Sequence, residues 1–73
     1  MRCNNQREIR NRMVVLRAEQ GLSQREVADK LGVSRQTIIS LEKNRYNPSL
    51  KLAFDVALLF DVDLHDVFQY EEE

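Results

Sequence analysis

A chain of 73 residues has room for one small domain and not for a second. Hydrophobic residues make up 42% of it and charged residues 32%, a balance typical of a folded globular domain and too apolar for a disordered chain. A single cysteine, Cys3, and a single histidine, His65, exclude a disulfide framework and a cysteine–histidine zinc site. We therefore expect neither a metal nor another cofactor.

Two further features concern membranes and export. Residues 1–6 are polar and lack the apolar segment of a secretory signal. The longest nearly apolar run, Val56 to Phe60, is far too short to span a bilayer. We expect a cytoplasmic protein with no membrane partner.

The charge is distributed unevenly along the chain. Residues 1–51 carry all 11 basic side chains against five acidic ones, a net of +6, whereas residues 52–73 carry seven acidic and no basic side chains, a net of −7. The total of −1 hides this asymmetry. Such a division is typical of chains that contact nucleic acid or a membrane surface.

The first half of the chain predicts two helices. Apolar residues at helical spacing from residue 9 to residue 16 indicate the first helix, and Gly21 ends it. A capping box, in which Ser23 is followed three residues later by Glu26, begins the second helix. That helix carries an apolar stripe, and Gly32 ends it.

Three further helices follow. Ser34 caps the third, and Ser49 caps the fourth after a turn over residues 44–48. The fourth is apolar almost all round from Leu50 to Phe60, so it either forms the centre of the core or buries one face against a partner. Asp63 caps a short fifth helix that ends at residue 67 or 68.

The last residues depart from the helical period. Residues 68–71 alternate apolar and polar side chains, as a short edge strand does. Its partner would come from the segment around Ile9 or from another chain, while a frayed tail anchored by Phe68 fits the pattern equally well. The fold class is therefore all-α, a compact five-helix domain, with short terminal β-strands as an addition.

The second and third helices have the features of a helix-turn-helix. They are joined by residues 31–34 only, which forces a steep crossing. Ala28 is small where the third helix passes close, and Gly32 adopts a positive φ that other residues resist. The apolar residues that join the two helices and seat them on the core are Val27, Leu31, Val33, Ile38 and Leu41.

The third helix presents an outward face suited to DNA bases. With Ile38 and Leu41 inward, its outward residues are Arg35, Gln36, Ile39, Ser40 and Lys43. Arginine can bridge guanine O6 and N7, and glutamine can bridge adenine N6 and N7. Ile39 is a candidate contact to a thymine methyl group, or packs against the following loop or a partner subunit.

Groups suited to phosphates surround this helix. Gln24 lies in the first turn of the second helix, where backbone N–H groups also favour an anion. The other expected phosphate contacts are Ser34, Lys43, Asn44 and Arg45, with Tyr46 beside them. Phosphate contacts set the register on DNA, and base contacts choose the sequence.

The segment from Leu22 to Lys43 resembles the helix-turn-helix of the Cro/repressor (Xre) type of transcriptional regulator. The resemblance continues through residues 44–50 and covers roughly residues 9–70. It implies a five-helix, lambda-repressor-like domain that binds double-stranded DNA at a palindromic operator as a homodimer, with recognition helix 34–43 in the major groove.

The resemblance also implies roles for single residues. Gln24 falls at a phosphate-contacting position, and Arg35, Gln36 and Ser40 fall at base-reading positions. Thr37 lies beside them, within reach of backbone or base. Arg17 and Glu42 fall where related proteins hold an ion pair that ties the first helix to the end of the recognition helix. An acidic Glu42 inside an otherwise positive surface agrees with such a pair.

The remaining predictions concern organisation and function. We expect a flexible arm over residues 1–8, the DNA-binding and dimerisation domain over residues 9–70, and an acidic tail over residues 71–73. The candidate dimer contacts are Leu59, Phe60, Val62, Leu64, Phe68 and Tyr70.

Two classes of function remain open from the sequence. The first is a sequence-specific regulator, in this family more often a repressor, with no small-molecule inducer site within this chain. The alternative is an antitoxin or other interaction module of the same fold that holds a partner through its acidic C-terminal part. An enzyme is not expected, because the sequence has no nucleophile–base pair, no phosphate-binding glycine-rich loop and no metal cluster.

Overall fold

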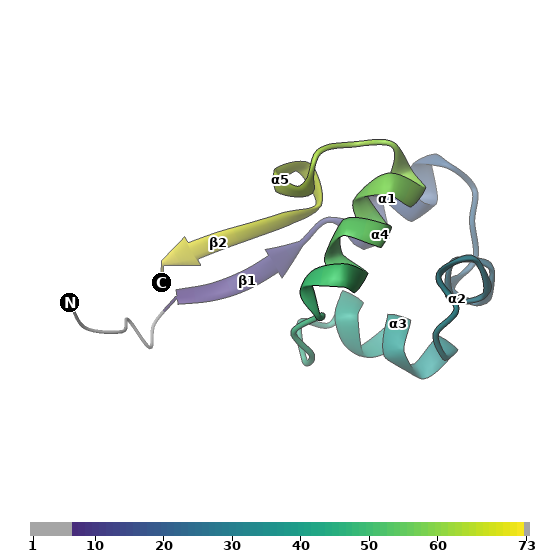
Figure 1. Cartoon of the computed structure of the whole chain (residues 1–73), viewed down its shortest axis with the longest axis horizontal. Coiled ribbons are helices and arrows are strands. Elements are labelled where there is room, and N and C mark those ends of the chain that lie inside the picture. Colours follow the sequence, from purple (N-terminus) through teal and green to yellow (C-terminus); the bar gives the residue numbers. More distant parts are fainter. Residues whose placement is uncertain (1–6, 73) are drawn as a thin grey trace.

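The computed structural model describes residues 7–72, with the side chains of residues 9–70. Five helices and two short strands follow one another along this part of the chain (Figure 1). Their bounds are β1 (Arg7–Asn11), α1 (Met13–Glu19), α2 (Gln24–Leu31), α3 (Arg35–Glu42), α4 (Leu50–Phe60), α5 (Leu64–Val67) and β2 (Phe68–Glu72). The folded part thus extends two residues beyond each predicted limit, and residues 1–6 and 73 of the predicted arm and tail lie outside the described residues.

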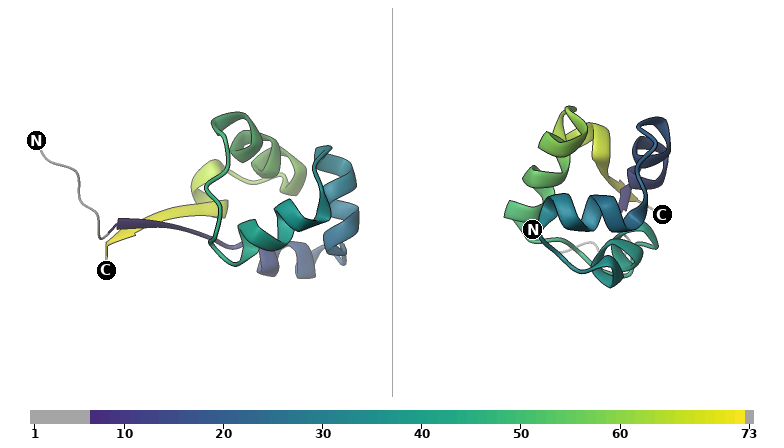
Figure 2. Two further views of the ribbon diagram at one scale, coloured as in Figure 1. Left: turned by 90° about the horizontal axis from the view of Figure 1, so that it is seen from below. Right: turned by 90° about the vertical axis from the view of Figure 1, so that its right-hand side faces the viewer.

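The predicted helices are present, and the two strands form one antiparallel ribbon. Ile9 of β1 pairs with Tyr70 of β2, and Asn11 pairs with Phe68. Ile9 is therefore part of a strand and not of the first helix, although its spacing from Met13 suits a helix. The ribbon runs away from the helices (Figures 1 and 2), and Arg7 pairs with Glu72 at the end of the ribbon that lies away from them.

Short polar residues fix where the helices begin. Ser23 and Glu26 form the predicted capping box: the Glu26 N–H donates to Ser23 Oγ at 3.0 Å, and the Ser23 N–H donates to Glu26 Oε1 at 2.8 Å. Gly32 ends α2 at φ 72°, the left-handed conformation expected of it. Asp61 ends α4 in the same conformation, at φ 57°, without a glycine.

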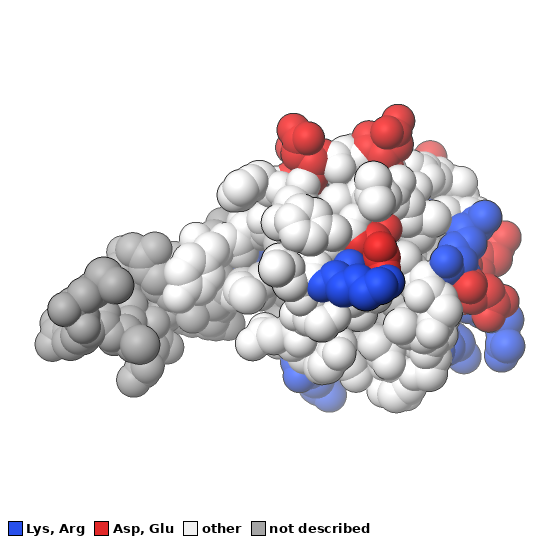
Figure 3. Space-filling model, in the orientation of Figure 1, with Lys and Arg blue, Asp and Glu red and all other residues white. Residues whose placement is uncertain are grey.

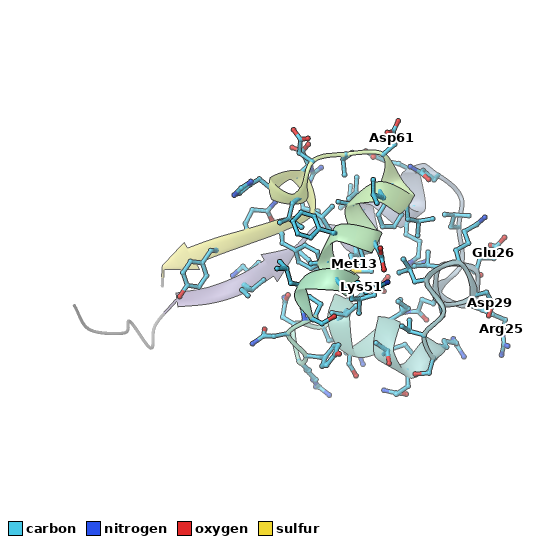
Figure 4. All side chains as sticks on the ribbon, in the orientation of Figure 1. Met13, Arg25, Glu26, Asp29, Lys51 and Asp61 are labelled. Carbon is cyan, nitrogen blue, oxygen red and sulfur yellow. The ribbon has the colours of Figure 1, made fainter. Side chains whose placement is uncertain are left out.

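The core lies between α1 and α4, which occupy opposite sides of the helical part, with α3 along its lower edge in Figure 1 and α2 at the end away from the ribbon (Figures 1 and 2). Met13 points into its centre (Figure 4) and is completely buried. The inward face of α4 supplies Leu52, Ala53, Val56, Ala57 and Phe60. None of the helices within residues 7–72 is long and apolar enough to cross a membrane.

One predicted dimer contact is wrong. Phe60 is only 2% exposed, because it lies with Val56 on the side of α4 against which the other helices pack. A side chain that fills the core of one subunit offers no surface to another. Four other candidates are partly buried against the same core: Leu59, Val62, Leu64 and Phe68. Tyr70, on the ribbon, is 62% exposed.

Candidate nucleic-acid interface

Helix α3 lies at the surface, between the predicted cap residue Ser34 and the C-terminal cap residue Lys43. Ser34 precedes it, and its Oγ accepts a hydrogen bond from the Thr37 N–H at 3.1 Å. The Ser34 and Thr37 hydroxyl groups are 2.9 Å apart and share a second hydrogen bond. Lys43 follows as the last cap residue. These contacts fix the first turn of α3, where the predicted base-reading side chains lie.

The outward face of α3 differs from its inward face as the sequence predicts. Ile38 and Leu41 are completely buried, whereas Arg35 and Gln36 are exposed at the N-terminal end of the helix. The other predicted base-reading residues are half-buried: Thr37, Ile39 and Ser40. The most accessible polar groups on this helix are therefore those best suited to guanine and adenine edges.

A network of polar side chains joins α1, α2 and α3 beneath this face. Arg17 Nε donates to Glu42 Oε2 at 2.8 Å, and Arg17 Nη2 donates to Glu42 Oε1 at 3.4 Å. Gln24 Nε2 also donates to Glu42 Oε1, at 3.0 Å. The Glu42 side chain is only 5% exposed, and that of Arg17 is 21% exposed. The expected ion pair between Arg17 and Glu42 is thus present, and Gln24 belongs to the same network.

The network continues to the exposed end of α3. Gln24 Oε1 accepts a long hydrogen bond, 3.5 Å, from Arg35 Nη2. Arg17 Nη1 meanwhile donates to the backbone carbonyl of Leu22 at 3.1 Å, in the turn before α2. A buried carboxylate thus orients an arginine and a glutamine, and the glutamine contacts a second arginine at the surface. This arrangement fixes side chains that would otherwise be free to rotate.

A groove of about 610 Å³ lies beside this network, between the start of α2 and the start of α3. Its lining residues are Arg17, Ser23, Gln24, Arg25 and Arg35. Arg25 points away from the body of the molecule at the same end of α2 (Figure 4). Arg25 and Arg35 lie in the first turns of α2 and α3, where unpaired backbone N–H groups also carry partial positive charge, and together they suit an anion such as a phosphate, whereas the charge of Arg17 is balanced by Glu42.

The comparison with known proteins bears on this site directly. A helix-turn-helix family model matches residues 15–67, which include all of α2, α3 and α4. The chain belongs to this family, the Xre-type helix-turn-helix transcriptional regulators. Its members are DNA-binding regulators and not enzymes.

Several named relatives share this family. A regulator of Methanocaldococcus jannaschii, named as an uncharacterized HTH-type transcriptional regulator, is 51% identical over 65 residues, which are 89% of this chain and 98% of the relative. A similarly named protein of Archaeoglobus fulgidus is 45% identical over 89% of this chain and 93% of its own. SinR of Bacillus subtilis is 33% identical over 89% of this chain and 60% of its own.

Solved structures carry the same fold. A candidate DNA-binding protein from Bacteroides fragilis superposes with a TM-score of 0.76 at 33% identity, over 84% of this chain and 98% of its own. The transcriptional regulator VanUg superposes with a TM-score of 0.77 over 99% of this chain and 100% of its own, and at 22% identity it shows the fold alone.

The C-terminal end of the regulator's α3 carries the other predicted phosphate contacts. Lys43, Asn44 and Arg45 are all exposed. Asn44 adopts a left-handed conformation, φ 58°, and its N–H donates to the Leu41 carbonyl at 3.0 Å. The Arg45 N–H donates to the Ser40 carbonyl at 2.9 Å. Polar groups therefore flank both ends of α3.

Asn11 at the end of β1 is a residue that the sequence reasoning missed. Its Nδ2 donates to the Leu41 carbonyl at 2.7 Å and to Asn44 Oδ1 at 3.0 Å. Its Oδ1 accepts from the Met13 N–H at 3.1 Å. One side chain therefore ties the start of α1 to the loop after α3. An asparagine two residues before a helix was the available signal.

The sequence reasoning also missed Arg25, and it left open which face of α4 is outward. Arg25 has no spacing signal of its own, because only the folded turn brings it beside Arg17 and Arg35. On α4, the exposed apolar side chains are Leu50, Phe54 and Leu58. The sequence indicates that one face of this helix could be buried against a partner, but not which face.

Proposed function

We propose that this regulator binds a palindromic operator in cytoplasmic DNA as a homodimer and represses transcription there. The observation that carries the proposal is the exposed pair Arg35 and Gln36 at the N-terminal end of α3, next to the arginine-lined groove. In a helix-turn-helix, the N-terminal end of the second helix enters the major groove. This end therefore combines groups that read bases with groups that hold phosphates.

The proposed roles divide along α3. Arg35 and Gln36 read bases, with Thr37, Ile39 and Ser40 contributing closer to the helix axis. The phosphate contacts lie at both ends of the helix: Gln24, Ser34, Lys43, Asn44 and Arg45. Gln24 already donates one amide hydrogen to Glu42, which leaves the second amide hydrogen for a phosphate oxygen. No inducer is part of the proposal.

The dimer and the operator follow from one symmetry argument. A small domain reads only a few base pairs, and two copies related by a two-fold axis read an inverted repeat of them. A bound dimer that overlaps a promoter blocks access to it, which gives repression as the simplest outcome.

Selection of binding sites from random duplex DNA tests this proposal. The expected result is an inverted repeat whose half-sites are centred about one helical turn, ~34 Å, apart. A reporter promoter that overlaps the selected site should then lose expression when the regulator is present. Selection of a single asymmetric site, or of no preferred sequence, would contradict the proposed operator.

A second candidate function is favoured by a groove at the end of α4. This groove, of about 340 Å³, is lined by Ala57, Leu58, Asp61, Val62, Asp63 and Asp66. Three carboxylates around an apolar floor suit a partner segment that alternates basic and apolar side chains, as the antitoxin alternative requires.

Replacing Asp61, Asp63 and Asp66 together by asparagine tests the second candidate, because asparagine keeps the helix caps and tolerates the left-handed conformation. The tagged parent and this variant would be recovered from native cells after nuclease treatment. A partner retained by the parent and lost by the variant supports the second function, and identical recovery rejects it.

A further inference from the structure

The outward face of α4 carries a continuous apolar stripe. Leu50 is 70% exposed, Phe54 is 50% exposed and Leu58 is 78% exposed. Residues four apart lie in one row along a helix, so these three side chains form a ridge with no polar residue between them. Figure 3 shows this side of the molecule as a mainly uncharged surface. Apolar rows of this length on a small domain mark protein interfaces.

The charges carried by α4 itself cancel. The charged residues of α4 are Lys51 and Asp55, which form an ion pair with a 2.7 Å separation between Lys51 Nζ and Asp55 Oδ2. Figure 4 shows Lys51 on the side of α4 that faces the viewer, and Figure 3 shows basic and acidic atoms together there. The middle of the stripe, around Phe54, therefore has no net charge and can approach an identical surface without repulsion. At the C-terminal end of the stripe, Leu58 also lines the groove that carries Asp61, Asp63 and Asp66.

The two grooves described above, between α2 and α3 and after α4, each carry charge of one sign. Two copies of the groove between α2 and α3 would bring arginines against arginines, and two copies of the groove after α4 would bring aspartates against aspartates. Charge complementarity thus favours the α4 stripe as the place where this chain meets a second copy of itself.

The position of the stripe leaves α3 open. In Figure 1, α4 lies on the side facing the viewer and α3 lies along the lower edge, and Figure 2 shows the same separation from below and from the side. A second subunit seated on the outward face of α4 therefore lies on a different side of the molecule from α3.

We propose that two copies of this chain associate through the stripe of Leu50, Phe54 and Leu58. The inference deepens the proposed function, which requires a homodimer, by locating the interface. A two-fold interface uses the same patch on both copies, so Phe54, the middle of the row, lies nearest the axis. Ridges of residues four apart pack into each other with helices crossing at about −50°.

The ion pair between Lys51 and Asp55 lies where it can contribute to the proposed interface. Lys51 and Asp55 lie one residue after Leu50 and Phe54, at the edge of the stripe. We place the two-fold axis across α4 near Phe54, so that the two copies of the helix run antiparallel. The ion pairs of the two copies then lie on the same edge of the interface, and the four charges alternate in sign. The edge of the interface therefore contributes specificity for a second copy, while the apolar ridge contributes affinity.

Replacement of Leu58 by aspartate tests the ridge. Sedimentation velocity at 1 to 100 µM, concentrations on the order of typical dimer constants, should show a dimer for the parent. The Leu58→Asp variant should dissociate at least about 30-fold more readily, the effect of losing one dominant interface side chain. Because Leu58 is 78% exposed within one subunit, the variant should fold as the parent does and give the same circular dichroism spectrum.

Two control variants separate this surface from the others. Val15→Asp changes an exposed apolar residue on α1, and Tyr70→Ser changes the ribbon; both should remain dimeric. A strictly monomeric parent, or a Tyr70→Ser variant that dissociates while Leu58→Asp does not, would overturn the proposal.

Mixing two charge-reversed variants tests whether the ion pairs of the two copies meet at the edge of the interface. Lys51→Glu makes the flank acidic, and Asp55→Lys makes it basic, so each variant alone should associate more weakly than the parent. An equimolar mixture should form a heterodimer, because the two flanks then attract each other. If the mixture associates no better than the separate variants, the pairs do not meet across the interface and the proposed geometry is wrong.

The experiments distinguish a failure of this interface from a failure of the proposed operator binding. A parent that dimerises through Leu58 but selects no DNA sequence leaves this interface intact and rejects the operator. A parent that selects an inverted repeat, with Leu58→Asp still dimeric, rejects this interface and leaves the operator intact.

Discussion

The α2–α3 surface and α4 are held in place by different forces. Beneath the first lies a polar network in which the nearly buried carboxylate of Glu42 receives hydrogen bonds from Arg17 and Gln24. The second is anchored by apolar packing of Leu52, Val56 and Phe60. A base-reading surface needs side chains held in direction, which hydrogen bonds provide, whereas a core helix needs only a close fit. The two regions should therefore fail in different ways.

Removing an apolar anchor of α4 should have the largest effect. Phe60→Ala leaves a cavity in the core and should lower the free energy of unfolding by about 4 kcal/mol, measured by urea denaturation. Phe60→Leu, which keeps more of the volume, should lose less than about 1.5 kcal/mol. Val15→Ala, at a side chain 45% exposed on α1, should change the free energy by no more than about 0.5 kcal/mol. Equal losses for Phe60→Ala and Val15→Ala would contradict the buried position of Phe60.

Removing the polar anchor should come next. Glu42→Ala leaves Arg17 without its carboxylate and should destabilise the fold by ~3 kcal/mol. For a domain of this size, that corresponds to a fall in Tm of roughly 12 to 24 °C. Asp29→Ala, at an exposed carboxylate on α2, serves as the control and should melt close to the parent. A Glu42→Ala melt that matches the parent would exclude a structural role for the ion pair.

Substitutions on the outer surface should separate affinity from specificity. Arg35→Ala should weaken binding to the selected operator by about 1–3 kcal/mol and relax the preference at one base position, with little effect on random DNA. Lys43→Ala should weaken all sequences alike and reduce the dependence of affinity on salt. Fluorescence anisotropy over a salt series on both DNAs measures the difference. If both variants change the two DNAs equally, the assignment of Arg35 to bases is wrong.

The smallest expected effect concerns the start of α2. Hydrogen bonds from the backbone N–H and the hydroxyl of Ser23 lower the pKa of Glu26 below its ordinary value of 4.5. Stabilisation by this carboxylate is complete above pH 4.5 and is lost as pH falls through the lowered pKa. The Glu26→Gln variant has no carboxylate to protonate at this position, so its free energy of unfolding should fall slightly less than that of the parent when the pH is lowered below 4.5. The measurement is the free energy of unfolding of parent and variant at a series of pH values. A difference between the two that stays constant from neutral pH to pH 3 (about 1.5 units below the ordinary value) would contradict this.

Much of the fold was predictable because its signals are local. Ser23, Ser34 and Ser49 each precede a helix, and Gly32 adopts the positive φ that the turn requires. The burial of Ile38 and Leu41 followed from helical spacing, and so did the exposure of Arg35 and Gln36 on the opposite side. The ion pair between Arg17 and Glu42 was expected only through the family resemblance, because 25 residues separate the two side chains in sequence.

Other features depend on contacts between distant segments. Ile9 fits a helix by spacing, but β2 lies beside it and pairs with it across the ribbon. Asn11 joins α1 to the loop after α3, and Arg25 meets Arg17 and Arg35 in one groove, without any spacing pattern that links them.

The sequence by itself determined the helices, the helix-turn-helix and the division of charge between the two parts of the chain, since each depends on neighbouring residues. Only the tertiary structure decided which side of the apolar helix α4 is buried. Its apolar residues cover nearly the whole circumference, so their period does not distinguish Phe60, which fills the core, from Phe54 and Leu58, which remain at the surface. The face of α4 that is buried is the one against which α1, α2 and α3 pack.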